Sequence, residues 1–333
     1  MSSTRLVPET RLMADAELSA DDAWHALRRY GGWALLRDAF VRFRYGDGFS
    51  HARAFALQLC LAVVPFLIAL TGLISELGVE EGGEVVADTV LALTPGASET
   101  MVKELLGEGE RTERVGELAL GLGLVTGLVA LTSTMAQIER GANRIYGVER
   151  DRPALWKYVR AAVLAVAAGL PALFGFLILV AGGPMGDSVQ RHYHWGVGAD
   201  AGWDVVRWPL SLGLTVLAVA VLFRYAPRRR QPGLSWLFFG AGIATVLWWL
   251  TSLLLAAYVA FGSGFGQTYG ALTGMMALLL WANLTGMALF GGLAFAAQLE
   301  ALRIGVEDPA RPDLWAPETD RSPLDDTGEM TAL

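Results

Sequence analysis

The sequence contains few of the residues that build catalytic and metal sites. Its one cysteine, Cys60, excludes an intramolecular disulfide, and because it lies inside an apolar run we expect a small buried hydrophobe there. Of the four histidines, only His192 and His194 form an HxH pair, and no HxHxDH cluster is present. We therefore predict no catalytic residues, no metal and no cofactor.

Charge is also scarce, and this absence points to a membrane. Only 18% of the 333 residues are charged, whereas 53% are hydrophobic, which is an apolar balance for a globular protein. About 20 apolar residues cross the hydrocarbon core as a helix. Six runs approach or exceed that length, so we predict an all-α integral membrane protein with about six transmembrane helices, at residues 54–75, 116–137, 159–182, 205–224, 234–261 and 271–299.

The basic residues alternate between the two sides of this predicted bundle. All but five of the 26 Lys and Arg residues fall before the first run, in the second and fourth connections, or after the last run; the exceptions are Lys103, Arg111, Arg114, Arg191 and Arg207. Basic loops face the cytoplasm. We expect both termini to be cytoplasmic and the chain to lie in the bacterial cytoplasmic (inner) membrane.

Three regions follow from this topology. Residues 1–50 form a cytoplasmic region with an amphipathic helix in the headgroup plane, where Trp24, Trp33 and Phe40 alternate with arginines that include Arg42. Residues 51–303 form the transmembrane domain, with an acidic extracytoplasmic cap at about 76–115 that is expected to be a solvated surface rather than a calcium site. Residues 304–333, rich in proline and acids, are predicted to be disordered.

Small and polar residues line one face of three predicted spans. Such stripes pack helices closely in lipid, where the hydrophobic effect does not drive association. The polar packing or cavity-lining candidates on them are Gln58, Pro65, Gln137, Asn283 and Gln298. They either form polar pairs between helices or border a path for a polar solute, since an amide in hydrocarbon is costly unless partnered or wetted.

The stretch GSGFGQTYGALTG, residues 262–274, joins the last two spans and contains no charge. It lacks the GxxxxGK[ST] order of a phosphate-binding loop. We predict a tight reversal followed by close helix packing, which assigns hairpin or packing roles to Gly264, Gly266, Tyr269, Gly270 and Gly274.

Membrane lipids are the expected partners, with anionic headgroups at the cytoplasmic face. The arginines placed there by the topology, and predicted to contact headgroups, are Arg140, Arg144, Arg228, Arg229 and Arg230. A nucleic-acid partner is not expected, and a homo-oligomer is left open.

Several motifs, taken in order, resemble the YihY/BrkB family of bacterial inner-membrane proteins. They are HARAFALQLCLAVVPFLIAL, ANRIYGVERDRP, FRYAPRRR, QPGLSW, TYGAL and LLLWANL, and the resemblance covers residues 47–303. It implies six membrane helices, an unsettled activity, and the family's historical labels of virulence factor and ribonuclease BN. Where relatives carry Gly-Ala-Glu-Leu-Asn late in the last span, this chain reads GGLAFAAQLE, so Gln298 and Glu300 are the available polar substitutes.

Three functions compete at this point. The first is a transporter or lipid-handling protein that uses the polar faces and the basic rim. The second is a non-transporting scaffold or interaction protein of the cell envelope. A ribonuclease is disfavoured because the chain has few histidines and its HxH pair falls on the predicted external side.

Overall fold

A computed structural model describes residues 4–9, 19–76, 113–149, 152–193, 197–261, 272–306 and 308–310. Within these ranges the chain is all-helical, and the extended backbone is limited to an isolated bridge between Thr4 and Ala310. The elements are α2 (Ala20–Tyr30), α3 (Gly32–Tyr45), α4 (Gly48–Glu76), α7 (Glu113–Ile145), α8 (Ala154–Tyr193), α9 (Val197–Tyr225), α10 (Leu234–Phe261) and α12 (Thr273–Arg303).

Five of these helices have the length and apolar composition needed to cross a membrane, namely α7, α8, α9, α10 and α12. Helix α4 coincides with the first predicted span and has 29 residues, but the structure does not describe the side chains of its last two to three turns. The helical membrane architecture is confirmed. The count of six spans and the cytoplasmic location of the termini stay predictions.

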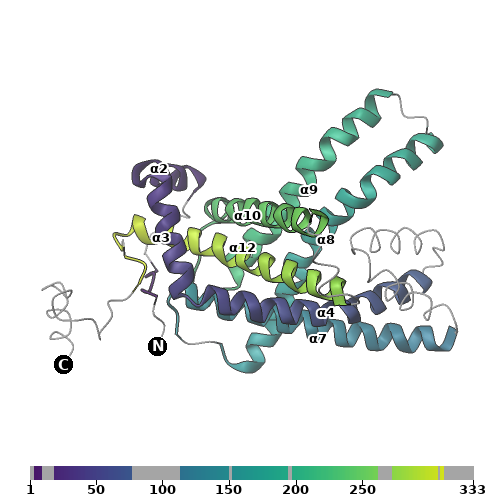
Figure 1. Cartoon of the computed structure of the whole chain (residues 1–333), viewed down its shortest axis with the longest axis horizontal. Coiled ribbons are helices and arrows are strands. Elements are labelled where there is room, and N and C mark those ends of the chain that lie inside the picture. Colours follow the sequence, from purple (N-terminus) through teal and green to yellow (C-terminus); the bar gives the residue numbers. More distant parts are fainter. Residues whose placement is uncertain are drawn as a thin grey trace, which may run out of the picture.

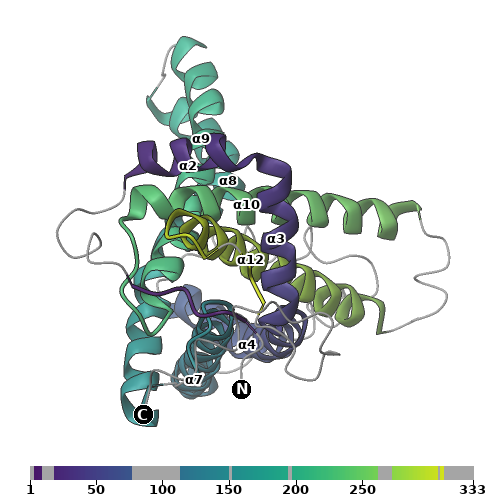
Figure 2. The same ribbon diagram turned by 90° about the vertical axis from the view of Figure 1, so that its left-hand side faces the viewer.

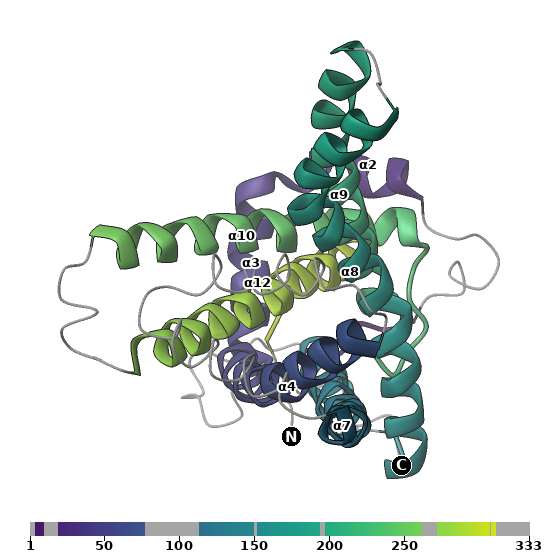
Figure 3. The same ribbon diagram turned by 90° about the vertical axis from the view of Figure 1, so that its right-hand side faces the viewer.

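The long helices are arranged as three neighbouring pairs, α4 with α7, α8 with α9, and α10 with α12. Figure 1 shows the α8–α9 pair leaving the bundle at an angle to α4, α7 and α12, and Figure 3 shows the same divergence with the right-hand side of Figure 1 facing the viewer. Helices α2 and α3 lie across the near end of the bundle in Figure 2. Polar contacts described below link α3, the end of α7, the loop after α9 and the end of α12, so these segments converge at this end.

Helix α12 is the centre of the bundle. It packs against α2, α3, α4, α7 and α10, and its residues from Ala288 to Leu302 are almost continuously buried. The contact with α10 is made by two glycines: a Cβ on Gly292 would lie 2.6 Å from the carbonyl oxygen of Gly240, and a Cβ on Gly240 would lie 2.9 Å from that of Gly292. The two backbones therefore touch where the helices meet.

The helices that carry the predicted stripes are neighbours, because α4 packs along both α7 and α12. On α7, Gly123, Gly127, Thr134 and Gln137 are buried. The exposed residues between them, as suits a lipid-facing surface, are Leu124, Val125, Leu128 and Val129. Small residues let α7 approach α4 closely.

Two boundaries differ from the sequence prediction. Helix α7 continues from residue 137 to Ile145, so Arg140 and Arg144 lie on its last turns rather than in a loop. The extension occurs because Ile138, Ala142 and Ile145 recur at helical spacing and are buried in the core. In the N-terminal region, Gly31 at φ +81° separates two helices where one was predicted.

Candidate functional site

The end where these helices converge holds a buried pair of opposite charges. The guanidinium of Arg229, in the loop after α9, donates from Nη2 to Glu300 Oε1 over 2.6 Å and from Nη1 to Oε2 over 3.1 Å. The side chains are 3% and 1% exposed. The guanidinium also lies 4.6 Å from the ring centroid of Tyr146. The fork geometry of arginine suits this two-point contact with a carboxylate.

A second buried guanidinium belongs to Arg42 of α3. Its Nε donates to Gln298 Oε1 over 2.7 Å, and its Nη1 donates to the backbone oxygens of Arg5 and Ile145 over 3.0 and 3.2 Å. The periodicity of α3 had suggested that Arg42 meets lipid. That prediction is wrong, because Arg42 lies on the face that carries Leu35, Ala39 and Phe43, which packs onto α12.

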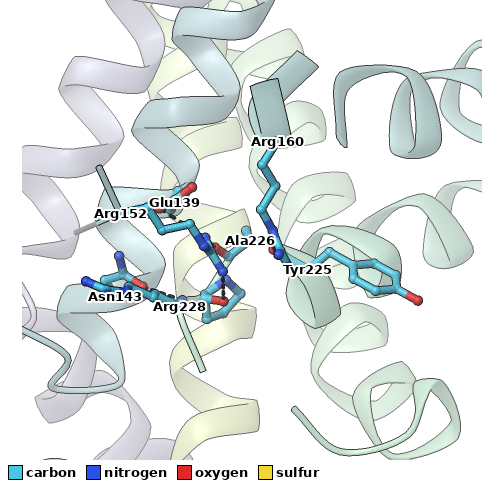
Figure 4. A network of polar contacts seen from close by, with 8 residues as sticks. Glu139, Asn143, Arg152, Arg160, Tyr225, Ala226 and Arg228 are labelled. Atoms are coloured by element: carbon cyan, nitrogen blue, oxygen red, sulfur yellow. Dashed lines mark hydrogen bonds and ion pairs between the residues drawn. The ribbon is translucent and has the colours of Figure 1, made fainter. Parts of the chain in front are cut away.

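A third cluster fixes the loop between α9 and α10. Arg152 lies 3.0 Å from Glu139 on α7 and donates to the backbone oxygens of Ala226 and Pro227 over 3.1 and 2.9 Å. Asn143 accepts from the backbone N–H of Arg228 over 2.7 Å. Figure 4 shows Arg152 placed between Glu139 and this loop. The ion pair of Glu139 is therefore formed with Arg152, which lies 13 residues away in the sequence.

Removing the Arg152 side chain is expected to loosen this loop. In Arg152→Met, Glu139 loses its ion pair and two loop carbonyls lose a donor, which should destabilise the local structure by roughly 1–3 kcal/mol. Trypsin should then cut faster at Arg228 and Arg230 in the purified protein, as measured by peptide masses over time. The comparison is Arg160→Met on α8, since Arg160 is exposed and donates to the Tyr225 oxygen at the end of α9 rather than to the loop. Equal cutting rates in the two variants would contradict the assigned role.

The N-terminal strap, defined as Thr4–Glu9, crosses this end of the bundle. Thr4 donates to the backbone oxygen of Arg144, Val7 N–H to that of Tyr146, and Arg5 N–H to that of Pro309. The strap passes so close to Gly147 that a Cβ there would lie 2.7 Å from Leu6 Cα. The strap also contacts a buried arginine, because its Arg5 carbonyl accepts from Arg42.

Further along the helices lies a separate polar level, formed by amides. His51 of α4 is near Phe290 of α12, with ring centroids 6.1 Å apart, and Ala52 and Phe55 contact Gly286. This antiparallel register, continued by one to two turns, brings Gln58 level with Asn283. Both side chains are partly buried.

The carbonyl oxygens of these two amides are unusual. Gln58 Oε1 and Asn283 Oδ1 are each buried without a hydrogen-bond partner among the residues that the structure describes. By contrast, Gln137 Nε2 lies 2.9 Å from His51 Nδ1, so it forms a polar pair. An unpartnered amide oxygen away from water costs about 1–3 kcal/mol.

The other sequence candidates are spread over the molecule. Gln298 is fully buried against Arg42, so it is a packing residue rather than a cavity-lining one. Pro65 lies inside α4 and is half-buried. Of the glycine stretch, Gly274 is buried in the first turn of α12, while Gly264, Gly266, Tyr269 and Gly270 lie outside the described residues.

Among the arginines predicted to contact headgroups, Arg229 is corrected by the structure. Its guanidinium is held by Glu300 and the Tyr146 ring, so it is unavailable to a lipid. Arg140, Arg228 and Arg230 are exposed and Arg144 is half-exposed, and their contacts with headgroups stay a prediction. The sequence did not single out Tyr146, and it assigned Arg42 to the headgroup plane, because the partners of both residues come from distant parts of the chain.

The described ranges contain no group of three or more His, Cys, Asp or Glu side chains able to hold a metal.

The model of the family described as virulence factor BrkB matches residues 39–317. The chain belongs to this family. The match spans α4 to α12 and includes Arg42, Arg229 and Glu300, so every buried ion pair described above falls within the family region.

Individual relatives agree with this family. The ribonuclease-like protein YfkH of Bacillus subtilis is 24% identical over 78% of this chain and 92% of its own length. A UPF0761 membrane protein of Chromohalobacter salexigens is 26% identical over 85% of this chain, and one of Alteromonas mediterranea is 27% identical over 62%; this chain spans 66% of the length of each. No solved structure matches this chain.

Proposed function

We propose that this BrkB-family protein is a transporter or lipid-handling protein of the bacterial cytoplasmic membrane, with both chain ends inside the cell. The single observation that supports it is the amide level, where two carbonyl oxygens on neighbouring helices lack a hydrogen-bond partner among the described residues. A structural polar pair would satisfy both groups. Two acceptors left open at one level suit a passing molecule that supplies the donors.

The substrate class follows from this chemistry. Carbonyl oxygens accept hydrogen bonds, so the complementary solute carries hydroxyl or amine donors. A lipid with a glycerol headgroup has such donors and an apolar body, and the apolar exposed faces of α7, α8 and α9 suit contact with lipid tails. A polar headgroup moving past the amides while its chains stay in the bilayer is the mode we propose.

Lipid scrambling in proteoliposomes tests this proposal. Fluorescent phosphatidylglycerol is placed in both leaflets, and dithionite quenches the outer leaflet; exchange by the protein appears as quenching beyond half of the signal. Gln58→Leu and Asn283→Leu should each slow this exchange by about fivefold to tenfold, because each removes one amide acceptor worth about 1 kcal/mol or more.

Ser133→Ala is the matched control, since Ser133 is also polar and within a span, but its hydroxyl donates to Val129 of its own helix. It should exchange lipid at the normal rate. Normal exchange in both amide variants would remove the amide level from the path. No exchange by the unmodified protein would instead favour a scaffold role.

A further inference from the structure

Arg42 has a charge without a carboxylate in contact. Its guanidinium is fully buried, and its three acceptors are all neutral, being an amide oxygen and two backbone carbonyls. The remaining nitrogen, Nη2, is buried without a hydrogen-bond partner among the described residues. An arginine in this setting has two N–H donors left to give.

The charges around Arg42 do not balance it. Glu300 is the nearby buried acid, and both of its oxygens are taken by Arg229. Arg5 brings a further positive charge, shared with the exposed Asp308 at 3.6 Å. Burial lowers the pKa of Arg42 to about 10, so the guanidinium still carries its charge at neutral pH. An unbalanced buried charge costs several kcal/mol, which a bound anion would recover.

Further donors lie beside this guanidinium. The hydroxyl of Tyr146, the residue that follows the Ile145 carbonyl bound by Arg42, is fully buried and has no hydrogen-bond partner among the described residues. The Gln231 amide lies next to that hydroxyl, yet neither group reaches hydrogen-bond geometry, and both polar atoms of the amide are buried. Arg42, Tyr146 and Gln231 thus bring unused donors to the same end of the bundle from three different segments of the chain.

The N-terminal strap occupies part of this region with oxygens of its own. The Arg5 carbonyl accepts from Arg42, and the Glu9 carboxylate accepts from the backbone N–H of Arg230 over 2.7 Å. Glu9 also lies close enough to Glu300 for the two carboxylates to repel each other. The strap therefore gives this positive region a carbonyl and a carboxylate, but it leaves Arg42 Nη2 unused.

We infer that Arg42, Tyr146 and Gln231 form a binding site for a phosphate group at this end of the bundle, and that the N-terminal strap closes it in the form described here. A phosphate has enough oxygens to accept from all three side chains at once, and guanidinium groups bind it with good geometry. When phosphate enters, its oxygens replace the Arg5 carbonyl and the strap lifts. This site is separate from the amide level and does not rest on the proposed function.

The phosphate could belong to a lipid headgroup or be free in solution, and two measurements distinguish these sources. Full-length protein in a maltoside detergent, which contains no phosphate, is heated with inorganic phosphate or with chloride at equal ionic strength, and the shift in Tm is compared. In the second measurement, native mass spectrometry counts bound phosphatidylglycerol, with a galactosyl diacylglycerol as the lipid that has hydroxyls but no phosphate.

Arg42→Gln should weaken whichever binding is seen by roughly tenfold to a hundredfold, the value of a hydrogen bond to a charged group. Arg44→Gln, exposed on the same helix, should bind normally. Tyr146→Phe keeps the ring against Arg229 and should weaken binding by about fivefold. If Arg42→Gln does not fold, Tyr146→Phe is the variant that tests the phosphate site.

Weakening the contacts of the strap should strengthen phosphate binding, whereas Arg42→Gln and Tyr146→Phe weaken it. Thr4→Ala combined with Glu9→Gln removes contacts that hold the strap and should tighten binding several-fold, because the competing oxygens leave more readily.

Binding of phosphatidylglycerol alone assigns the site to a headgroup, and a Tm shift with inorganic phosphate alone assigns it to the free ion. The site is refuted by absence of both, or by normal binding in Arg42→Gln or, where that variant does not fold, in Tyr146→Phe.

Discussion

Glu300→Gln is expected to destabilise the protein by about 3–5 kcal/mol, which is the usual effect of removing one partner from a buried ion pair. The substitution keeps the size of the side chain but leaves the charge of Arg229 without its counter-ion in a region where Arg42 is already unbalanced. This loss of stability is measured by heating each variant in nanodiscs and recording the fraction of protein that remains monodisperse at each temperature.

Replacing both residues of the Arg229–Glu300 pair distinguishes the cost of an unpaired buried charge from the net contribution of the pair to stability. Arg229→Met with Glu300→Leu removes both charges and fills a similar volume, so it should recover most of the stability that Glu300→Gln loses. The exposed pair Arg37 and Asp38 gives the control, because Arg37→Gln there should change stability by less than about 1 kcal/mol. Equal effects of Glu300→Gln and Arg37→Gln would show that burial of the Arg229 pair is unimportant.

Gly292→Val is expected to separate α10 from α12 and to lower stability by about 3 kcal/mol or more. Even a Cβ at this position would lie 2.5 Å from Ala244 Cβ and 2.6 Å from the Gly240 oxygen, and backbone cannot rotate away as a side chain can. We expect little folded protein by size-exclusion chromatography, and early loss of the remainder on heating.

Gly242 provides the control for this substitution. It lies on α10 two residues from Gly240, and a Cβ there meets no atom within 4 Å. Gly242→Ala should therefore be neutral or stabilising by up to about 1 kcal/mol, since alanine favours the helix. A destabilised Gly242→Ala, or a Gly292→Val that unfolds normally, would contradict the close contact of the two helices.

The sequence predicts the helices of this protein better than their contacts. Apolar runs locate the long helices because 20 consecutive apolar residues have few other stable conformations. The end of α7 was missed because residues 138–145 are amphipathic, and an amphipathic stretch does not reveal whether water or another helix covers its apolar face. Arg42 was misplaced for the same reason, as its partner Gln298 is 256 positions away.

One close helix contact was not singled out from the sequence. With 39 glycines in the chain, the pattern favoured Gly270 and Gly274 at the start of the last span, which stays a prediction because Gly270 lies outside the described residues. The contact that the structure describes joins Gly240 and Gly292. Only the partner helix decides which glycine meets a backbone. The amides Gln58 and Asn283 were found from sequence because a polar side chain in an apolar run is visible without knowing the fold.

The bond between Arg5 and Pro309 joins residues that leave the ribosome about 300 positions apart. During synthesis Arg5 emerges long before Pro309 exists, so this bond cannot form until the final helix has been made. Until then Arg42 also lacks its partner Gln298 on that helix. The contacts of Arg5 and Arg42 with the C-terminal part of the chain are therefore among the last in this end of the bundle to form.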